Sequence, residues 1–496
     1  SSSYQGGLIA SYFLPFHFSS FLKNIPSPCM VFLPRFFSLH SRRFQHQFHR
    51  LREVSYPVHD KKPNFVSVKE ALKDIRSGWN IFVGGSASSP TPLLVGLHEE
   101  AERRDLKGIS LHHIHLHGPS PWSAEGSSGR VRSNALFLGA GQNKDVNAGR
   151  VDFVPIFLTD VAKMFYRKRV PLDAAFVTVS PPDERGFCSL GVSVDCVRSA
   201  VTMAPSLIGV VSSSMPRTHG ESLIHSSHFD ALVHDDNHLL YERKMGETGE
   251  AEKKIGKLIA NNLVDNGSTM QMGVGDVPDA TLAALSQHKD LGIHTEMISD
   301  GVVPLIENNV ITNRLKTTMP GKVVTSFAYG TRKLYDFLDN NPLFHFAGVE
   351  WTNDPRVIAA QRQMIAINSF VEIDITGQIC SDSIGRRLLS GFGGQVDFIY
   401  GSSISDDGFG KPIMAAPSTN KKSGESKIVS QLKPGAGVVT SRAHVHYVVT
   451  EYGIANLWGR NVRQRAFDLI RIAHPSHRER LEKETFERLG CMPSND

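Results

Sequence analysis

The stretch that decides the fold runs from Ser268 to Gly301 and reads STMQMGVGDVPDATLAALSQHKDLGIHTEMISDG. Its apolar start, Thr269 to Val274, predicts a strand that leads into the glycine loop Gly273-Val274-Gly275. Asp276 is expected to be the N-cap of the helix that follows, with Pro278 just inside it. A strand, a glycine loop and a helix in this order indicate an α/β unit built on a parallel sheet.

Glu296 is the candidate catalytic residue of this stretch. It lies near the end of a second predicted strand, Gly292 to Ile298, and the capping cluster Ser299-Asp300-Gly301 follows. Carboxylates at the carboxyl ends of strands lie where α/β sheets bind ligands. The loop at 273–277 would aim backbone N–H groups at a phosphate or an oxyanion. It is not a complete G-x-G-x-x-G dinucleotide fingerprint, because Pro278 occupies the third position.

These two segments resemble the acetyl-CoA hydrolase/transferase family, the glutamate-dependent class I CoA-transferases. HTEMISDG at 294–301 is similar to the family's H-x-E-M-x-S-D-G segment, which carries the nucleophilic glutamate. GVGDVPDA at 273–280 is similar to its G-x-G-x-x-P-x-A loop, which touches CoA. The resemblance extends over roughly residues 65 to 480. It implies that Glu296 is catalytic and that five residues bind CoA: Gly273, Val274, Gly275, Asp276 and Val277.

A second glycine-rich segment, SGFGGQVDF at 390–398, belongs to the same resemblance. It follows a predicted strand, Ile367 to Asp374. Its glycines predict a backbone cradle for a developing oxyanion and for the pantetheine arm, and a flexible hairpin is the alternative. Lys411 matches a lysine that the family sets near CoA. The resemblance thus adds five CoA-binding candidates: Asn368, Gly391, Gly393, Gly394 and Lys411.

The rest of the chain alternates strands and helices, which predicts the α/β class. The polar segment 242–254 is interpreted as a domain boundary. We therefore expect two similar open, mostly parallel-sheet domains, at 63–250 and 251–496, and the resemblance places the active site at their interface. The strands predicted for the first domain are Asn80–Val83, Ile109–Leu116, Val151–Leu158, Ala174–Val179 and Ser206–Val211.

Composition is that of a globular chain with enough residues for two or more domains: 496 residues, 40% hydrophobic and 21% charged. Six of the 54 Lys and Arg residues, and no Asp or Glu, lie in residues 1–52, so the remainder has a formal charge of −1 where the whole chain has +5. A nucleic-acid partner is therefore not indicated. No apolar stretch reaches the length that a membrane span needs.

Residues 1–62 are interpreted as a presequence and linker. From Met30 the segment MVFLPRFFSLHSRRFQHQFHRL is amphipathic, Arg-rich and free of acidic residues, as mitochondrial presequences are. We expect the protein in the mitochondrial matrix; a tail without a targeting role is the alternative. The start codon and the cleavage site stay open.

Other reactive residues are interpreted as structural. His113, His115 and His117 would share one face of a strand and could ligate zinc, but no carboxylate or Cys partner is evident and no metal is expected. Five cysteines lack C-x-x-C spacing. Cys188 has no evident His partner, which favours a packed thiol over a nucleophile.

The sequence does not have the features that three other functions would require. A serine thioesterase needs G-x-S-x-G, which is absent. His294-Thr295-Glu296 matches the H-x-E of zinc deaminases, but no P-C-x-x-C follows. A nucleotide-binding module would have no use for a carboxylate at a strand end beside the glycine loop.

The resemblance implies a CoA-transferase that works by a ping-pong mechanism. Glu296 would attack an acyl-CoA thioester, giving a mixed anhydride and CoA thiolate, and the thiolate would then form a glutamyl-CoA thioester. A second carboxylate would reverse these steps. The implied partners are acyl-CoA, acetyl-CoA first, and a short-chain carboxylate such as acetate, succinate, propionate or 4-hydroxybutyrate. CoA is a substrate, no further cofactor is implied, and the implied assembly is a homodimer.

Two matters stay open in the sequence. Water could take the glutamyl-CoA in place of a carboxylate, which would make the protein an acetyl-CoA hydrolase on the same glutamate. The acceptor is not chosen either, because acyl-pocket residues come from scattered loops. Glu296 itself should be ionised: from a usual pKa near 4.3, burial would have to cost about 3.7 kcal/mol to neutralise half of it at pH 7.

Overall fold

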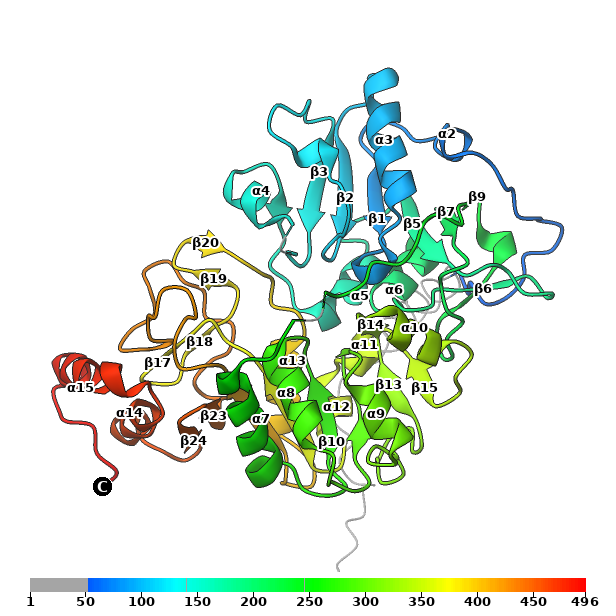
Figure 1. The fold of residues 1–496 in the computed structure, drawn as a ribbon. Helices are drawn as coiled ribbons and strands as arrows, with labels where there is room; N and C mark the ends of the chain where they lie inside the picture. Colours follow the sequence, from blue (N-terminus) through cyan, green and yellow to red (C-terminus); the bar gives the residue numbers. More distant parts are fainter. Residues whose placement is uncertain (1–51, 140, 245) are drawn as a thin grey trace, which may run out of the picture. The chain divides into compact units, whose positions relative to one another are not determined.

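The structure is a computed structural model that describes residues 52–139, 141–244 and 246–496. The predicted presequence up to residue 51 lies outside the described residues. Glu53–Asp496 form one compact unit. Two sheets organise this unit, one on each side of residue 250 (Figure 1).

The first sheet has seven strands in the order β4-β3-β2-β1-β5-β7-β9, and every neighbouring pair is parallel. Three of the predicted strands have the predicted bounds, and two were predicted too long: Ile109–Leu116 ends at His113, and only Asp152–Phe153 of Val151–Leu158 is a strand. Pro155 cannot donate a ladder hydrogen bond, so β4 ends at Phe153 and a helix begins at Leu158. The strands are β1 (Asn80–Val83), β2 (Ile109–His113), β3 (Val131–Ala135), β4 (Asp152–Phe153), β5 (Ala174–Val179), β7 (Ser206–Val211) and β9 (Ala231–His234).

The second sheet has six strands in the order β11-β10-β16-β21-β23-β24, and only the last pair is antiparallel. The α/β class with mostly parallel sheets is confirmed. The strands are β10 (Thr269–Met272), β11 (Gly292–Ile293), β16 (Met364–Asn368), β21 (Lys411–Ala415), β23 (Tyr447–Thr450) and β24 (Gly453–Asn456).

Two strands predicted as continuous are broken. The predicted strand Gly292–Ile298 is divided into β11 and β12 (Met297–Ile298), because the chain leaves the six-stranded sheet and pairs β12 with β14 (Phe327–Ala328). The predicted strand Ile367–Asp374 is divided into β16 and β17 (Glu372–Asp374), which belongs to a separate small sheet. Both breaks fall at the carboxyl edge of the main sheet, where the chain turns away from it.

Among the described residues, five small sheets accompany the two large ones, and the β12–β14 pair is one of them. Their remaining strands are β6 (Phe187–Ser189) with β8 (Leu223–His225), β13 (Val323–Thr325) with β15 (Phe344–Phe346), β18 (Ile379–Cys380) and β22 (Ile428–Val429) on either side of β17, and β19 (Ser383–Ile384) with β20 (Arg387–Leu388).

The helices lie around the sheets in Figure 1. In the first half they are α2 (Val68–Ala71), α3 (Thr91–Arg103), α4 (Asn143–Asn147), α5 (Leu158–Tyr166) and α6 (Val197–Met203). In the second half they are α7 (Glu250–Leu263), α8 (Asp276–Ala284), α9 (Val302–Glu307), α10 (Arg332–Leu338), α11 (Val349–Thr352), α12 (Pro355–Ala359), α13 (Gln395–Ser403), α14 (Val462–Arg471) and α15 (Pro475–Leu489). Among the described residues no helix is long and apolar enough to cross a lipid bilayer.

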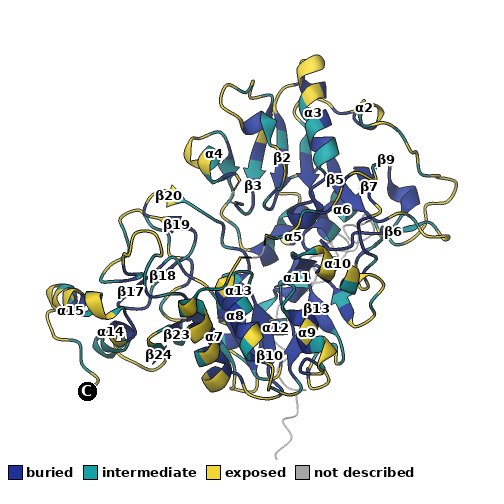
Figure 2. Ribbon diagram, viewed as in Figure 1, coloured by how far each residue is buried: buried dark blue, intermediate teal, exposed yellow. Residues whose placement is uncertain are grey.

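The largest apolar core is shared by the two halves. One continuous cluster of buried side chains includes Phe82 and Val177 from strands of the first sheet and Ile293 and Ile367 from strands of the second. The buried strands and the exposed outer helix faces are visible in Figure 2. The predicted boundary near residue 250 therefore separates two sheets, but not two independent cores.

Candidate active site

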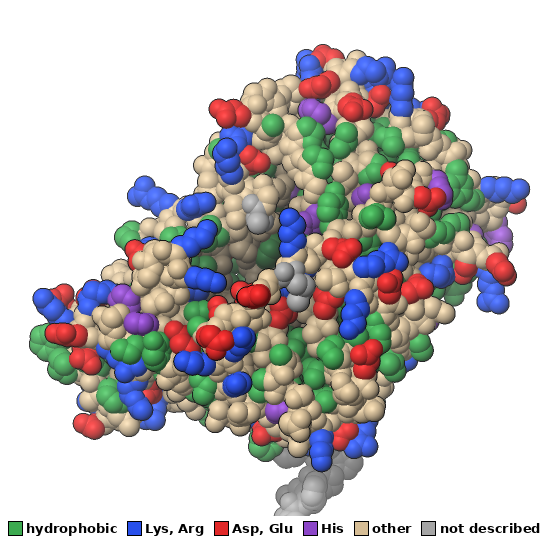
Figure 3. All heavy atoms as spheres, in the orientation of Figure 1, with side chains coloured by type: hydrophobic (Ala, Val, Ile, Leu, Met, Phe, Trp, Pro, Cys, Tyr) green, Lys and Arg blue, Asp and Glu red, His purple; other side chains and the backbone are tan. Residues whose placement is uncertain are grey.

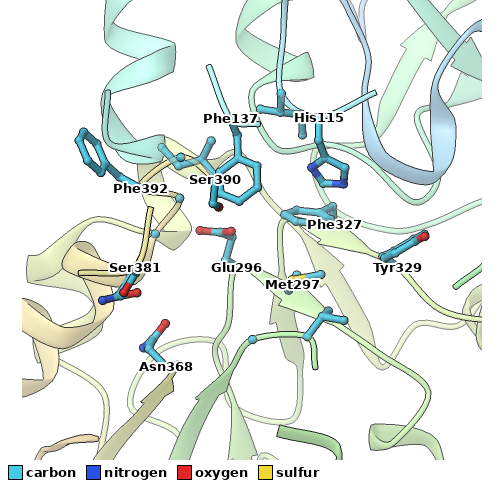
Figure 4. A pocket seen from close by; sticks show the side chains of 18 of the residues that line it. His115, Phe137, Glu296, Met297, Phe327, Tyr329, Asn368, Ser381, Ser390 and Phe392 are labelled. Atoms are coloured by element: carbon cyan, nitrogen blue, oxygen red, sulfur yellow. The ribbon is translucent and has the colours of Figure 1, made fainter. Parts of the chain in front are cut away.

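A cavity of about 640 Å³ opens where residues of the two halves meet. Ile114, His115, His117, Phe137 and Leu158 line it from the first half. From the second half come the glycine loop, Glu296 and the glycine-rich segment after Ser390. A hollow is visible near the centre of the face shown in Figure 3, and Figure 4 shows Glu296 in the middle of the cavity with Phe137 and Ser390 close by. Of the described residues that line it, only Glu296 carries a formal charge at neutral pH.

The backbone of Glu296 is fixed where the chain passes from one sheet to the next. Its carbonyl oxygen accepts hydrogen bonds from the backbone N–H groups of Ser326 (2.9 Å) and Phe327 (3.1 Å). The Thr325 hydroxyl donates to the same oxygen at 3.2 Å. The prediction that Glu296 lies near the end of one continuous strand is wrong, since it lies between β11 and β12. The side chain consequently leaves the sheet edge and reaches into the cavity.

Among the described residues, the carboxylate of Glu296 has polar donors but no cation beside it. Asn353 donates its amide Nδ2–H to Oε2 at 2.7 Å. Burial raises the pKa of Glu296 to about 7; the Asn353 hydrogen bond opposes this rise, nearby Asp195 adds to it, and the backbone N–H of Gly394 opposes it. Burial thus cancels most of the difference between the usual pKa and pH 7, so Glu296 is not fully ionised as expected but about equally acid and carboxylate at that pH.

His294, two residues before the nucleophile candidate, is structural. It is fully buried, and its Nε2–H donates to the carbonyl oxygen of Thr352 at 2.8 Å. Burial lowers its pKa to about 3, so it is neutral. Its ring packs edge-on against Trp351. It thereby ties the Glu296 segment to α11, whose C-cap is Asn353.

Gly394 approaches the carboxylate more closely than any side chain would allow. A Cβ built on it would lie 2.0 Å from Glu296 Oε2 and 2.4 Å from Asn353 Nδ2. Gly394 is the N-cap of α13, and its own φ of −99° suits any residue. Glycine is needed here for space and not for backbone conformation. Gly391 and Gly393 also line the cavity, beside Phe137.

The glycine loop forms the opposite wall of the cavity. Gly273 and Val274 line it. Gly275, and not Asp276 as expected, is the N-cap of α8; its φ of 142° is strained for any other residue. Asp276 and Val277 line a second cavity of about 500 Å³, together with Lys421 and Lys427. The predicted loop thus lies between two hollows.

Asn368 and Lys411 lie at opposite ends of neighbouring strands. Asn368 lines the first cavity and donates Nδ2–H to Gln271 Oε1 at 2.9 Å. It pairs in register with Met414, whereas Lys411 pairs with Ile365, about 10 Å back along the sheet. The Lys411 ammonium donates to the Leu263 carbonyl oxygen at 2.9 Å and pairs with Asp265 at 2.7 Å. Lys411 is thus the one predicted site residue that the structure holds at the far edge of the sheet.

Two of the three histidines, His115 and His117, line the cavity. β2 ends at His113, so His115 and His117 do not continue its face as expected. Burial lowers the pKa of His115 to about 3, with His117 and His113 adding to the effect. His117 stacks on Tyr329, 5.1 Å between ring centroids. Throughout the described parts of the chain, no group of three His, Cys, Asp or Glu side chains could hold a metal ion.

Cys188 packs as a buried thiol on β6. Burial raises its pKa to about 12, so it carries no thiolate at neutral pH. It is absent from the described cavity lining. Its interpretation as a packed thiol, and not a nucleophile, agrees with this environment.

Sequence reasoning missed Asn353, Phe137 and Tyr329. Asn353 stands in WTNDP at 351–355, where Asn-Asp-Pro signals an ordinary turn. Phe137 and Tyr329 follow short strands and carry no motif of their own. Phe137 reaches the cavity of Glu296 only because the two halves meet, and Tyr329 reaches it because β14 pairs with β12 (Figure 4).

The chain matches one protein family in both of its parts. Residues 51–240 match the acetyl-CoA hydrolase/transferase N-terminal domain and residues 330–485 match the C-terminal domain. Glu296 lies between the two matched ranges.

Individual relatives are similar over most of their length. A succinyl-CoA:acetate/propanoyl-CoA:succinate CoA transferase of Fasciola hepatica is 49% identical over 92% of this chain and 94% of its own. A 4-hydroxybutyrate coenzyme A transferase of Clostridium kluyveri is 43% identical over 85% and 97%. The crystal structure of a 4-hydroxybutyrate CoA-transferase from Porphyromonas gingivalis has a TM-score of 0.72 at 37% identity, covering 86% of this chain and 98% of that one. Relatives named acetyl-CoA hydrolase are less similar, at 24–28% identity.

Proposed function

The chain belongs to the acetyl-CoA hydrolase/transferase family and is a CoA-transferase, and on this premise we propose that Glu296 is the nucleophile that carries CoA between two carboxylic acids. The observation that supports this assignment is that Glu296 is the one acidic or basic side chain, histidines aside, on the described lining of the cavity. Asn353 donates a hydrogen bond of 2.7 Å to its carboxylate.

The reaction exchanges acyl and thioester bonds without needing a proton. A carboxylate oxygen of Glu296 adds to the thioester carbonyl of acyl-CoA, and CoA leaves as thiolate, so that a mixed anhydride remains. The thiolate attacks the glutamyl carbonyl and expels the first carboxylate. The glutamyl-CoA thioester then passes through the same steps in reverse with the second carboxylate. Acyl-CoA and carboxylate are thereby exchanged with no net change in charge.

The surroundings of Glu296 suit these steps. A desolvated carboxylate attacks more readily than a hydrated one, and burial keeps water from the anhydride. The Asn353 amide and the Gly394 backbone N–H lie beside the oxygen on which negative charge gathers in a tetrahedral intermediate. Such donors each contribute about 3–4 kcal/mol to transition-state stabilisation.

In this proposal CoA occupies the two hollows that the glycine loop separates. The apolar first cavity takes the acyl group and the pantetheine arm. The second cavity contains Lys421 and Lys427, which would meet the CoA phosphates, but its lining also includes the carboxylates of Glu250, Glu252, Asp276 and Glu451. The wall between the pantetheine arm and the nucleotide part of CoA would be formed by Gly273, Val274, Gly275, Asp276 and Val277. The residues along the pantetheine arm would be Asn368, Gly391, Gly393 and Gly394. The homodimer that the resemblance implies stays a prediction.

Transfer and not hydrolysis is proposed as the main reaction, with acetyl-CoA as donor and a short-chain carboxylate as acceptor. Water is present at about 55 M, but effective molarities of about 10⁵ M or more are reachable for a well-placed carboxylate. We expect acetyl-CoA loss to be slow alone and to rise at least about tenfold with propionate, succinate, butyrate or 4-hydroxybutyrate. New acyl-CoA should appear in equal amount, as measured by chromatography. An unchanged rate of acetyl-CoA loss with every acceptor would make the protein a hydrolase.

We also propose that the protein acts in the mitochondrial matrix, because residues 1–52 carry six basic and no acidic residues. The leader would then be removed on import. N-terminal sequencing of the protein purified from its own cells should find a start beyond Arg43. A native protein that still contains Arg42-Arg43 would contradict the proposal.

A further inference from the structure

A second carboxyl group, that of Asp397, is buried behind the Glu296–Asn353 pair. Asp397 lies on α13, three residues after Gly394, and is 4% exposed. It is not among the residues that line the cavity. Asn353 lies between the two acids: its Nδ2–H donates to Glu296, and its side chain also hydrogen-bonds the carboxyl of Asp397. That bond and one from the Thr159 backbone N–H favour the ionised form of Asp397, against burial and the charge of Glu296.

The charged groups that face Asp397 are acidic. They are Glu296 on the connection between β11 and β12 and Asp160 on α5. On the remaining packed elements, the cations are engaged elsewhere: Arg356 of α12 pairs with Asp354, and Lys411 of β21 with Asp265. Burial first, and then Glu296, raise the pKa of Asp397 well above its usual range. Asp397 therefore keeps its proton where an ordinary aspartate loses it.

Two buried oxygens in this group have no donor. Among the described residues, Asp397 Oδ2 and Asn353 Oδ1 both lack a hydrogen-bond partner. Both oxygens are acceptors when Asp397 is ionised, which leaves two unmatched acceptors in a dry site. A proton on Asp397 provides the missing donor and removes one of two neighbouring negative charges.

We propose that Asp397 is a positioning residue of the transfer reaction: it remains a neutral carboxylic acid behind Glu296 and holds Asn353 with its amide nitrogen toward the nucleophile. This proposal rests on the proposed role of Glu296. Asp397 takes no part in the bond exchange and gives up no proton in it. Its ionisation at alkaline pH would attract the Asn353 amide N–H away from Glu296 and place two negative charges side by side.

The test compares Asp397→Asn and Asp397→Ala in the full chain, with transfer from acetyl-CoA to propionate measured between about pH 5.5 and 9.5. Wild type should give a bell-shaped kcat profile, rising as Glu296 ionises and falling as Asp397 ionises. Asp397→Asn keeps a neutral donor, so its kcat at pH 7 should stay within about threefold and its alkaline decline should vanish. Asp397→Ala should lower kcat by about tenfold or more with the KM for acetyl-CoA within about twofold.

Thermal unfolding gives a second measurement that does not depend on activity. Because the folded-state pKa of Asp397 is raised, its contribution to stability is lost as the pH rises through that value. The Tm of Asp397→Asn relative to wild type should therefore increase from pH 6 to pH 9. An equal Tm difference at all pH values would overturn the proposal.

Asp160→Asn is the matched control, since it removes the other acid that faces Asp397. The Asp160 side chain is 44% exposed and pairs with Lys163, so its loss should shift the alkaline limb by less than about half a pH unit. A shift as large as that of Asp397→Asn would contradict the assignment. The assignment would also be contradicted if folded Asp397→Asn lost more than about tenfold in kcat, or if Asp397→Ala kept the kcat of wild type. None of these outcomes depends on whether an adduct forms on Glu296, so failure of the nucleophile assignment is recognised separately.

Discussion

We expect Glu296→Gln to lower the rate of CoA transfer by about 10⁴-fold or more, because the amide keeps the shape of the side chain and loses the nucleophile. The Asn353 contact involves a single Glu296 oxygen, which the amide carbonyl can replace. CoA binding, measured by calorimetry, should therefore stay within about threefold of wild type. Wild type incubated with acyl-CoA alone should hold CoA covalently at Glu296, as mass spectrometry of its peptides would show.

Two controls accompany this experiment. Glu100→Gln replaces another buried glutamate, on α3, where it pairs with Arg103 away from the cavity, and should leave transfer unchanged. Cys188→Ser tests the only other nucleophile that the sequence suggested. An adduct that maps to Cys188, or turnover without any adduct, would show that Glu296 is not the nucleophile.

Gly394→Ala should abolish most activity for a steric reason. Its Cβ would stand 2.0 Å from Glu296 Oε2, so the carboxylate or α13 has to move. Because a misplacement of about 1 Å can cost about 100-fold, we expect kcat to fall by at least that factor. The measurement is steady-state transfer from acetyl-CoA to propionate, with Tm as a check on folding.

Gly84→Ala is the matched control for this substitution. Gly84 is also a buried glycine, but its Cβ would meet its nearest atom, the Phe176 carbonyl oxygen, at an ordinary 3.5 Å. It should remain active. A Gly394→Ala enzyme with wild-type kcat and Tm would mean that Glu296 does not need its observed position for transfer.

The sequence was sufficient for the parts of the fold that depend on local pattern. The buried run Ala174–Val179 is apolar throughout and β-rich, and β5 has those bounds. The strand around Glu296 was predicted one element too long because His294 to Glu296 continue a strand-like pattern. Their backbone partners, Val324, Ser326 and Phe327, come from 30 residues later in the chain, and local propensity does not contain such pairings.

The same distinction applies to the site. Glu296 and the glycines were found because a carboxylate near a strand end and two glycine-rich loops match segments of a known family. No sequence motif marks Asn353 or Asp397 as a site residue, since the first is the C-cap of the short helix α11 and the second lies inside α13. Their importance arises from burial beside one carboxylate, which only the folded chain creates. Lys411 shows the opposite case, in which a motif match alone says little about which end of a strand faces the ligand.

The apolar cluster that joins the two halves affects how substrates reach Glu296. Hinge rotation of one half away from the other would have to divide this shared cluster, at a cost of about 25 cal/mol for each Å² of apolar surface exposed to water. The movement of a single loop avoids this cost. Entry and exit of substrates should instead depend on movement of the segment 390–393. This segment has only one large apolar side chain, Phe392, and belongs to none of the buried apolar clusters. Loop motions take nanoseconds to microseconds and are faster than hinge motions. CoA entry would therefore not be the rate-limiting step of turnover.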